Sequence, residues 1–152
     1  MILMPKRHFL AALLAAGMLA ASALAHAIEF RSVADEIAVL RDAPSEDATK
    51  RTILTRGYPV EVIIESGGWV RVRDEVGSFG WIETKRLASK RTVMVSEAVA
   101  QAHESPSESS AVVFRAEKGV FLDFVGISGG WAKVRHRTGT VGYVRLRDLW
   151  GV

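Results

Sequence analysis

The chain has 152 residues, of which 49% are hydrophobic, with 20 Lys and Arg against 17 Asp and Glu. This composition is too apolar for an intrinsically disordered chain and lacks the Gly and Pro excess of a fibrous one. The absence of cysteine excludes a disulfide framework, a thiolate zinc site, a cysteine nucleophile and a lipidated N-terminal cysteine.

Residues 1–27 have the pattern of a secretory signal peptide. Lys6 and Arg7 form a basic N-terminal region, and residues 9–25 form a 17-residue apolar run. Ala25 and Ala27 then supply the small residues that signal peptidase needs at positions −3 and −1. A retained membrane anchor is the competing interpretation, but 17 helical residues rise only about 25 Å, short of the roughly 30 Å hydrocarbon core. We therefore expect cleavage after Ala27 and a mature protein that is periplasmic or otherwise exported. It would meet the membrane only through an uncleaved signal segment.

Without that segment the chain is almost neutral. Residues 28–152 hold 18 Lys and Arg against 17 Asp and Glu, and no helix with a basic stripe is evident. A nucleic-acid-binding domain normally shows a basic patch or stripe. We therefore expect no nucleic-acid partner.

The rest of the chain consists of two copies of one repeat unit. An offset of 62 residues aligns residues 30–90 with 92–152 without a gap, and 15 of the 61 pairs are identical. The identities cluster at Gly, Pro and Trp, whose geometry is hardest to replace. This duplication predicts two domains, residues 28–89 and 90–152.

The sequence pattern of each copy predicts a series of short strands. In the first copy, residues 30–34 and 37–41 predict a first pair of strands across a short turn. Alternation over residues 60–65, a Ser-Gly-Gly turn and renewed alternation over 69–73 predict a hairpin. A further strand at 79–82 follows a second turn near Gly77.

The second copy repeats this order, and residues 83–87 and 145–149 each suit one 3₁₀ turn. Five or so strands in about 60 residues, with loops rich in Ser, Pro and Gly, predict an all-β fold of two small, strongly bent barrels. Domains of this size are near the lower limit for folding alone, and only Ala88 and Ser89 separate the copies. We therefore expect the barrels to dock.

Several motifs resemble those of bacterial SH3-like (SH3b) domains. Residues 40–45 (Leu-Arg-Asp-Ala-Pro-Ser) resemble their "(L/V)R-x-x-P-S" loop, and residues 67–72 and 80–82 resemble their "GW-x-x-V … GWV" core. Residues 57–63 and 149–152 resemble the corresponding segments of one exported subfamily of tandem SH3-like proteins, a subfamily without established activity. The resemblance covers residues 30–152 and implies two tandem SH3-like barrels. Related domains in cell-wall hydrolases are targeting modules that contact peptidoglycan or its peptides, so the resemblance implies a similar role.

The second copy departs from this pattern at the loop. It has His103-Glu104-Ser105 where the first copy has Arg41-Asp42-Ala43, and Gln101 in place of Val39.

Aromatic and basic residues recur on one predicted face of each barrel. If Val70 and Val72 face the core, the alternate residues of the same strand point outward. An aromatic platform with cationic neighbours would suit a peptide carboxylate or the apolar face of a sugar. The alternative is that the aromatics pack under the proline loops or between the barrels. The candidate ligand-binding residues are Trp69, Arg71, Arg73 and Trp81 in the first copy and Trp131, Lys133, Arg135 and Tyr143 in the second.

No catalytic or metal site is predicted. Residues 126–130 match the G-x-S-x-G pattern of serine hydrolases, but their counterparts at 64–68 indicate a hairpin turn, whereas a nucleophile elbow needs a strand-to-helix turn. His103 and His136 lack the spacing of metal ligands, and we expect both to be solvated. We therefore expect no enzyme, metal or cofactor.

Charge differs between the copies. Residues 28–89 carry a net charge of −2 and residues 90–152 a net charge of +3. This difference could orient the docking of the barrels or steer an anionic partner to the second copy, or it could be scattered solvated charge.

Two functional hypotheses follow. The first is a non-catalytic exported binding module for peptidoglycan or its stem peptides, that is, a cell-wall peptide or glycan. The alternative is a protein–protein adaptor, a subunit of a cell-envelope assembly that binds an envelope protein, for example at an exposed strand edge.

Overall fold

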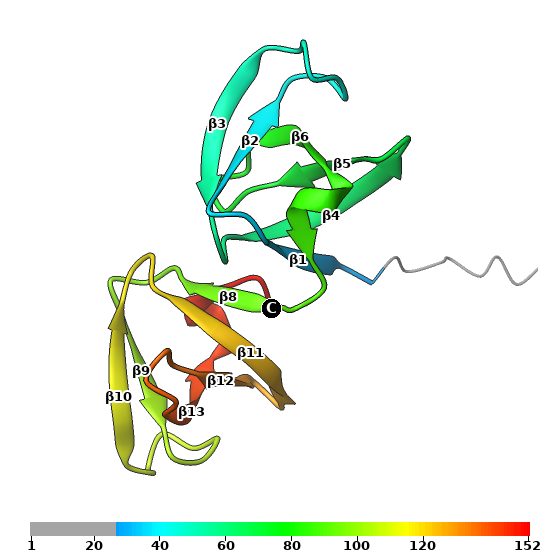
Figure 1. Ribbon diagram of the computed structural model, residues 1–152. Helices are drawn as coiled ribbons and strands as arrows, with labels where there is room; N and C mark the ends of the chain where they lie inside the picture. Colours follow the sequence, from blue (N-terminus) through cyan, green and yellow to red (C-terminus); the bar gives the residue numbers. More distant parts are fainter. Residues whose placement is uncertain (1–26) are drawn as a thin grey trace, which may run out of the picture.

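The computed structural model describes residues 27–152, which form two small β-barrels, the first above the second in Figure 1. The predicted signal peptide therefore lies outside the described residues except for Ala27. Within the described range, no helix is long and apolar enough to cross a membrane.

Each barrel is one seven-stranded sheet, and the two sheets have the same order. The first runs β3-β2-β6-β5-β4-β1-β7 and the second β10-β9-β13-β12-β11-β8-β14. The predicted all-β architecture of two tandem barrels is confirmed. The elements of the first barrel are β1 (Glu29–Val33), β2 (Ile37–Arg41), β3 (Lys50–Thr55), β4 (Pro59–Ser66), β5 (Trp69–Arg73), β6 (Phe79–Glu83), η1 (Thr84–Arg86) and β7 (Leu87–Ala88). Those of the second are β8 (Thr92–Val95), β9 (Val99–His103), β10 (Val112–Glu117), β11 (Phe121–Ser128), β12 (Trp131–Arg135), β13 (Val141–Arg145), η2 (Leu146–Asp148) and β14 (Leu149–Trp150).

The central three strands of each barrel form as predicted. β4 pairs with β5 and β5 with β6, all antiparallel, and β11, β12 and β13 repeat this arrangement. The two 3₁₀ turns, η1 and η2, also lie within the predicted segments.

The predicted pairing of the first two strands is wrong. β1 pairs with β4 and β7, whereas β2 pairs with β3, a strand that the sequence pattern did not indicate. The backbone N–H and C=O of Val33 bond to Tyr58 and Gly57, so the chain leaves β1 at a corner of the barrel and does not fold back on it. The sequence does not predict strand β3 because only Leu54 in it is buried, so its apolar and polar residues hardly alternate.

The core of each barrel is made of inward-facing aliphatic residues. Val70 and Val72 are fully buried, whereas Arg71 between them is exposed, so the expected alternation on β5 is confirmed. Gly80 on the adjacent strand has no room for a side chain, because a Cβ there would lie 2.9 Å from Leu40 Cβ. Two cores result, one in each barrel.

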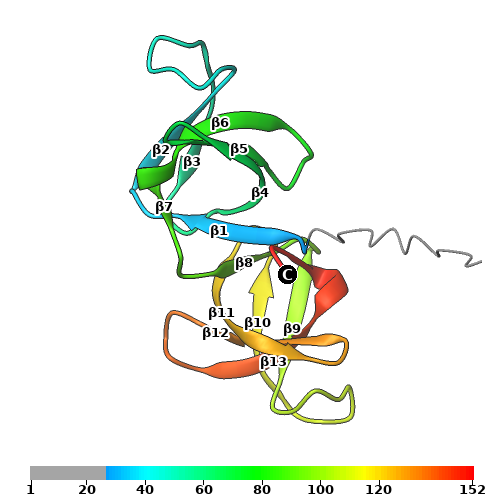
Figure 2. The ribbon, with the colours of Figure 1, turned by 90° about the vertical axis from the view of Figure 1, so that its right-hand side faces the viewer.

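The barrels meet along β1 and the start of β4 in the first copy and β8, the start of β11 and β14 in the second (Figures 1 and 2). The indole Nε1 of Trp150 donates to the carbonyl of Pro59 at 3.0 Å, and its ring packs edge-on against Phe30 at 5.2 Å. Tyr58 and Phe121 form a second edge-on pair at 5.9 Å. The docking expected from the short connection is therefore present.

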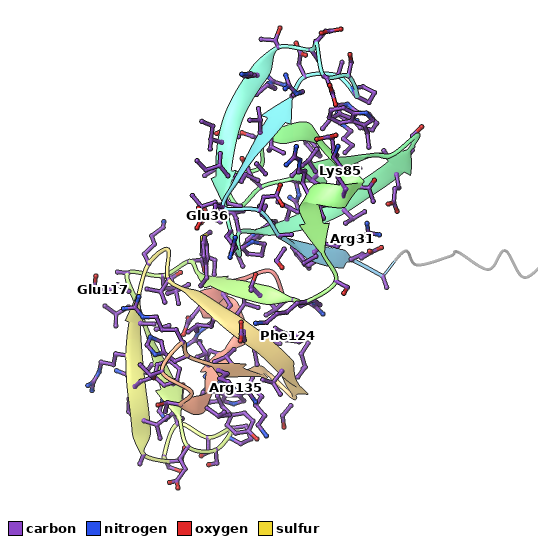
Figure 3. The ribbon with its side chains drawn as sticks, in the orientation of Figure 1. Arg31, Glu36, Lys85, Glu117, Phe124 and Arg135 are labelled. Atoms are coloured by element: carbon purple, nitrogen blue, oxygen red, sulfur yellow. The ribbon has the colours of Figure 1, made fainter. Side chains whose placement is uncertain are left out.

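Polar contacts reinforce this junction. The Thr92 hydroxyl donates to the carbonyl of Gly57, and the Ser32 hydroxyl donates to that of Lys90. The Arg91 guanidinium lies 5.9 Å from the ring centre of Phe30 across the junction and 4.2 Å from that of Phe124 in its own barrel, which Figure 3 labels, and burial lowers the pKa of Arg91.

Candidate functional site

A groove on the second barrel forms where three strand ends meet. Trp131 begins β12 and Arg145 ends β13, and the antiparallel register places them opposite each other. The Arg145 guanidinium lies 4.5 Å from the centre of the Trp131 ring, and the ring of His103, at the end of β9, packs edge-on against it at 5.3 Å. The groove has a volume of about 300 Å³, and its other lining residues are Val99, Gln101, Glu108, Arg147 and Asp148.

The loop between β9 and β10 forms one wall of this groove. The Ser110 hydroxyl lies within bonding distance of the carbonyls of Ser105 and Ser107, at 3.0 and 2.8 Å, which holds the loop together. The Nδ1 of His103 lies 3.0 Å from the Ser110 carbonyl; because a carbonyl only accepts, this nitrogen carries the proton. Glu108, in the same loop, forms an ion pair with Arg145.

The first barrel has an equivalent, smaller groove of about 130 Å³. Trp69 begins β5 and lies opposite Glu83, which stands where the second copy has Arg145. Arg41 takes the place of His103, and its Nη1 donates to the Ala48 carbonyl at 2.8 Å, so it fastens the loop at the equivalent carbonyl. The two grooves therefore share one framework.

Their charges differ. Glu83 forms ion pairs with Lys85 at 2.7 Å and with Arg86 at 3.0 Å. The hydrogen bonds that these two side chains donate to it lower the pKa of Glu83. Arg86 also bonds to Asp35, which raises the pKa of Arg86. Opposite the tryptophan, the first groove therefore has a carboxylate, with Arg41 and Arg86 beside it, and the second has a guanidinium, with Glu108 and Asp148 beside it.

The structure brings the predicted aromatic residues to two places. Trp69 and Trp131 lie in the grooves, Trp69 half-buried and Trp131 buried. Trp81 and Tyr143 are half-buried on the outer faces of β6 and β13, opposite Arg71 and Lys133. None of these four is among the aromatic residues that contact across the barrel junction in the described part of the chain.

The predicted basic residues do not gather in the grooves. Arg71 lies over the ring of Phe79, 5.0 Å from its centre, and lines a separate hollow of about 580 Å³ in the first barrel. Arg73 bonds to Glu61 at 2.6 Å and lies over the Trp150 ring, so it belongs to the barrel junction. Lys133 lies 5.9 Å from the centre of the Tyr143 ring. Arg135 is exposed in the second barrel (Figure 3).

Sequence reasoning missed the polar partners of the tryptophans. Arg145 and Glu83 could have been found by extending the predicted hairpin register from the tryptophans to the opposite strand ends. The expectation that His103 is solvated is wrong, because its ring packs against Trp131 and is only 7% exposed. His136 is half-buried beside Phe114, and its Nδ1 lies 2.8 Å from the Thr138 hydroxyl.

The G-x-S-x-G segment is a hairpin turn, as predicted. Ser128 ends β11, and Gly129 in the turn has a φ of 58°. Among residues 27–152, no group of three or more His, Asp or Glu side chains could hold a metal ion.

Comparison with known proteins gives the following matches. The solved structures that resemble the chain include NlpC2 and NlpC1 from Trichomonas vaginalis and an NlpC/P60 family protein from Bacillus cereus. Their identities are 16, 18 and 18%, their TM-scores 0.38, 0.39 and 0.37, and the matches cover 82, 85 and 80% of this chain. The same matches cover 48, 48 and 56% of those proteins, so the chain spans about half their length. No curated protein matches the chain significantly.

The family model of the bacterial SH3 domain matches the chain twice, over residues 34–88 and 96–151. Each match begins just after the first strand of a barrel and ends at its last strand. The two matches cover most of the chain, which therefore belongs to the bacterial SH3 domain family and carries two of its domains in tandem.

Proposed function

We propose that the protein is a non-catalytic exported module that binds peptidoglycan or its stem peptides. Bacterial SH3 domains are typically cell-wall-binding modules. The observation that carries the proposal is the repeated groove, in which Trp69, half-buried, and Trp131, buried, lie beside charged side chains at equivalent positions of both barrels. An aromatic floor beside charged groups binds a peptide backbone or a sugar ring together with its ionic groups.

The non-catalytic assignment is supported by the surroundings of Ser128. It ends a strand and is followed by a Gly-Gly turn and a further strand, so it lacks the strand-to-helix turn of a hydrolase nucleophile. A hydrolytic activity lost in Ser128→Ala would contradict the assignment.

Sedimentation with isolated sacculi tests the function. The purified protein should pellet with sacculi, and Trp69→Ala and Trp131→Ala should each weaken binding roughly tenfold or more, since aromatic anchors dominate binding surfaces. Phe79→Ala, in which an exposed aromatic outside both grooves is removed, serves as the control and should bind normally. Amide spectra should show that each variant is folded. A protein that stays in the supernatant and shows no shifts with muropeptides would disprove the function.

The adaptor function remains a second candidate because of one feature of the sheet. Strand β3 ends the hydrogen-bonded order of the first sheet, and Ile53 on it is 64% exposed, an arrangement that can accept an added strand. A photocrosslinker at position 53 that captures one stoichiometric envelope protein in intact cells would favour this function.

A further inference from the structure

Arg145 uses only part of its hydrogen-bonding edge. Its Nη2 pairs with one oxygen of Glu108, while its Nε is buried and has no partner among the described residues. The Nε and Nη2 of a guanidinium lie on one edge and match the two oxygens of a single carboxylate. A buried donor without a partner is unfavourable, so this edge is better satisfied by a carboxylate that approaches it squarely.

Glu108 is a weak occupant of this edge. Its side chain is 63% exposed, and ion pairs with exposed partners contribute little to stability. The loop that carries it is fixed by the hydrogen bonds of Ser110, so the Glu108 side chain can leave Arg145 without unfolding the loop.

The contact with Trp131 prepares Arg145 to pair with a carboxylate. Stacking on Trp131 holds the guanidinium plane in place and limits its hydration, which strengthens its pairing with a carboxylate. Arg147 also lines the groove, with a side chain that is 75% exposed and forms an ion pair with Asp148 at 3.6 Å, so both guanidiniums of the groove have a carboxylate neighbour. In the first barrel Glu83 stands in place of Arg145 opposite Trp69, and the guanidiniums of Arg41 and Arg86 line that groove from other positions.

We propose that the groove of the second barrel binds the free carboxylate of a peptide, and that Glu108 occupies this site as an internal competitor until the ligand displaces it. The ligand carboxylate would take the Nε and Nη2 of Arg145, whose guanidinium covers the buried Trp131 ring. This proposal rests on the proposed function, because it names the chemical group that the second groove recognises in a cell-wall peptide.

Titration with N-acetyl-D-alanyl-D-alanine and with its C-terminal amide, followed by amide and indole NMR shifts of the whole protein, tests this proposal. The acid should shift the Trp131 indole resonance and should bind at least tenfold more tightly than the amide. Glu108→Gln should strengthen binding of the acid by roughly two- to fivefold, the effect of removing an exposed ion pair. Glu46→Gln, the equivalent change in the first barrel, should leave binding unchanged.

Changes at Arg145 complete the experiment. Arg145→Gln should abolish the preference for the acid, and Arg145→Lys, which keeps the charge without the planar edge, should retain only part of it. Equal binding of acid and amide by the wild type, or no effect of Glu108→Gln, would overturn the proposal. Sedimentation with sacculi separates this outcome from the broader function: pelleting without acid preference refutes only the carboxylate site, whereas acid preference without pelleting refutes only the cell-wall function.

Discussion

Trp69 and Trp131 occupy the same position of the repeat but differ in their surroundings. The residue across the sheet makes the difference, because the Arg145 guanidinium can stack on an aromatic face and the Glu83 carboxylate cannot. Trp131 is therefore covered, while Trp69 is only half-buried. The difference on the neighbouring strand, together with His103 in place of Arg41, gives two copies of the same residue different surroundings.

The glycine in the last long strand of each barrel is a position where an added methyl group should destabilise the protein. In Gly142→Ala the new Cβ would lie 2.9 Å from both Ala102 Cβ and Val113 Cγ2, and Gly80→Ala meets Leu40 at the same distance. We expect each change to lower the free energy of unfolding by about 1–3 kcal/mol, measured by urea denaturation.

Gly126→Ala is the matched control for these variants. It lies in β11, where no atom outside its chain neighbours comes within 4 Å of an added Cβ. Its φ is not in the left-handed region, so the change should be neutral or stabilising by about 0.4–1 kcal/mol. Equal losses at Gly126 and Gly142 would contradict the close packing described for β9 and β13.

Which side chains face inward could be predicted from the sequence, and which side chains meet could not. The period of two in residues 69–73 is enough to separate Val70 and Val72 from their neighbours. The burial of His103 depends on contacts with Trp131, 28 positions along the chain, and on the fold of the intervening loop. Local patterning contains no signal for such a contact.

At the scale of elements, the short turn η1 is held by ion pairs that should make stability depend on pH. The pKa of Glu83 is lowered by hydrogen bonds from Lys85 and Arg86, so the folded state binds fewer protons than the unfolded state near pH 4. The contribution is complete above the unfolded pKa of about 4.3 and is lost as the pH falls through the lower folded value. Glu83→Gln should therefore reduce the difference in unfolding free energy between pH 7 and about pH 3.

Glu46→Gln is the control for this pH dependence, because Glu46 is exposed and has no ion pair within the described residues. It should show the wild-type difference between the two pH values. A Glu83→Gln variant with the same pH dependence as wild type would show that the η1 ion pairs do not contribute to folding.

The strands differ in how much of their pairing could be predicted. β4, β5 and β6 are joined by short Gly-containing turns, so adjacency in the sequence implies pairing. β1 pairs instead with β4 and with β7, more than 50 residues later, because a barrel closes through contacts between distant segments. Closure of this kind is set by the whole sheet, and an isolated pair of apolar runs does not reveal it.

At the scale of the whole molecule, Trp150 should couple the stability of the two barrels. Trp150→Ala removes the hydrogen bond to Pro59 and the packing against Phe30. We expect a loss on the order of 3 kcal/mol, as for other large-to-small changes of aromatic residues. Amide hydrogen exchange should become faster in β1 and β4 of the first barrel as well as in the second barrel.

Tyr143→Ala serves as the control for this coupling, because Tyr143 is a half-buried aromatic on the outer face of the second barrel. Its effect on hydrogen exchange should stay within that barrel. If Trp150→Ala also leaves exchange in β1 and β4 unchanged, the barrels are stabilised independently.

The junction has a further consequence for assembly. Both copies present their first strand and the start of their longest strand to it, through Phe30 and Pro59 on one side and Thr92 and Phe121 on the other. When two equivalent surfaces contact each other, each barrel covers the surface patch to which a third copy would have to bind. Joined in this way, the pair forms a closed unit, and a third module of the same kind could not extend it into a filament through that patch.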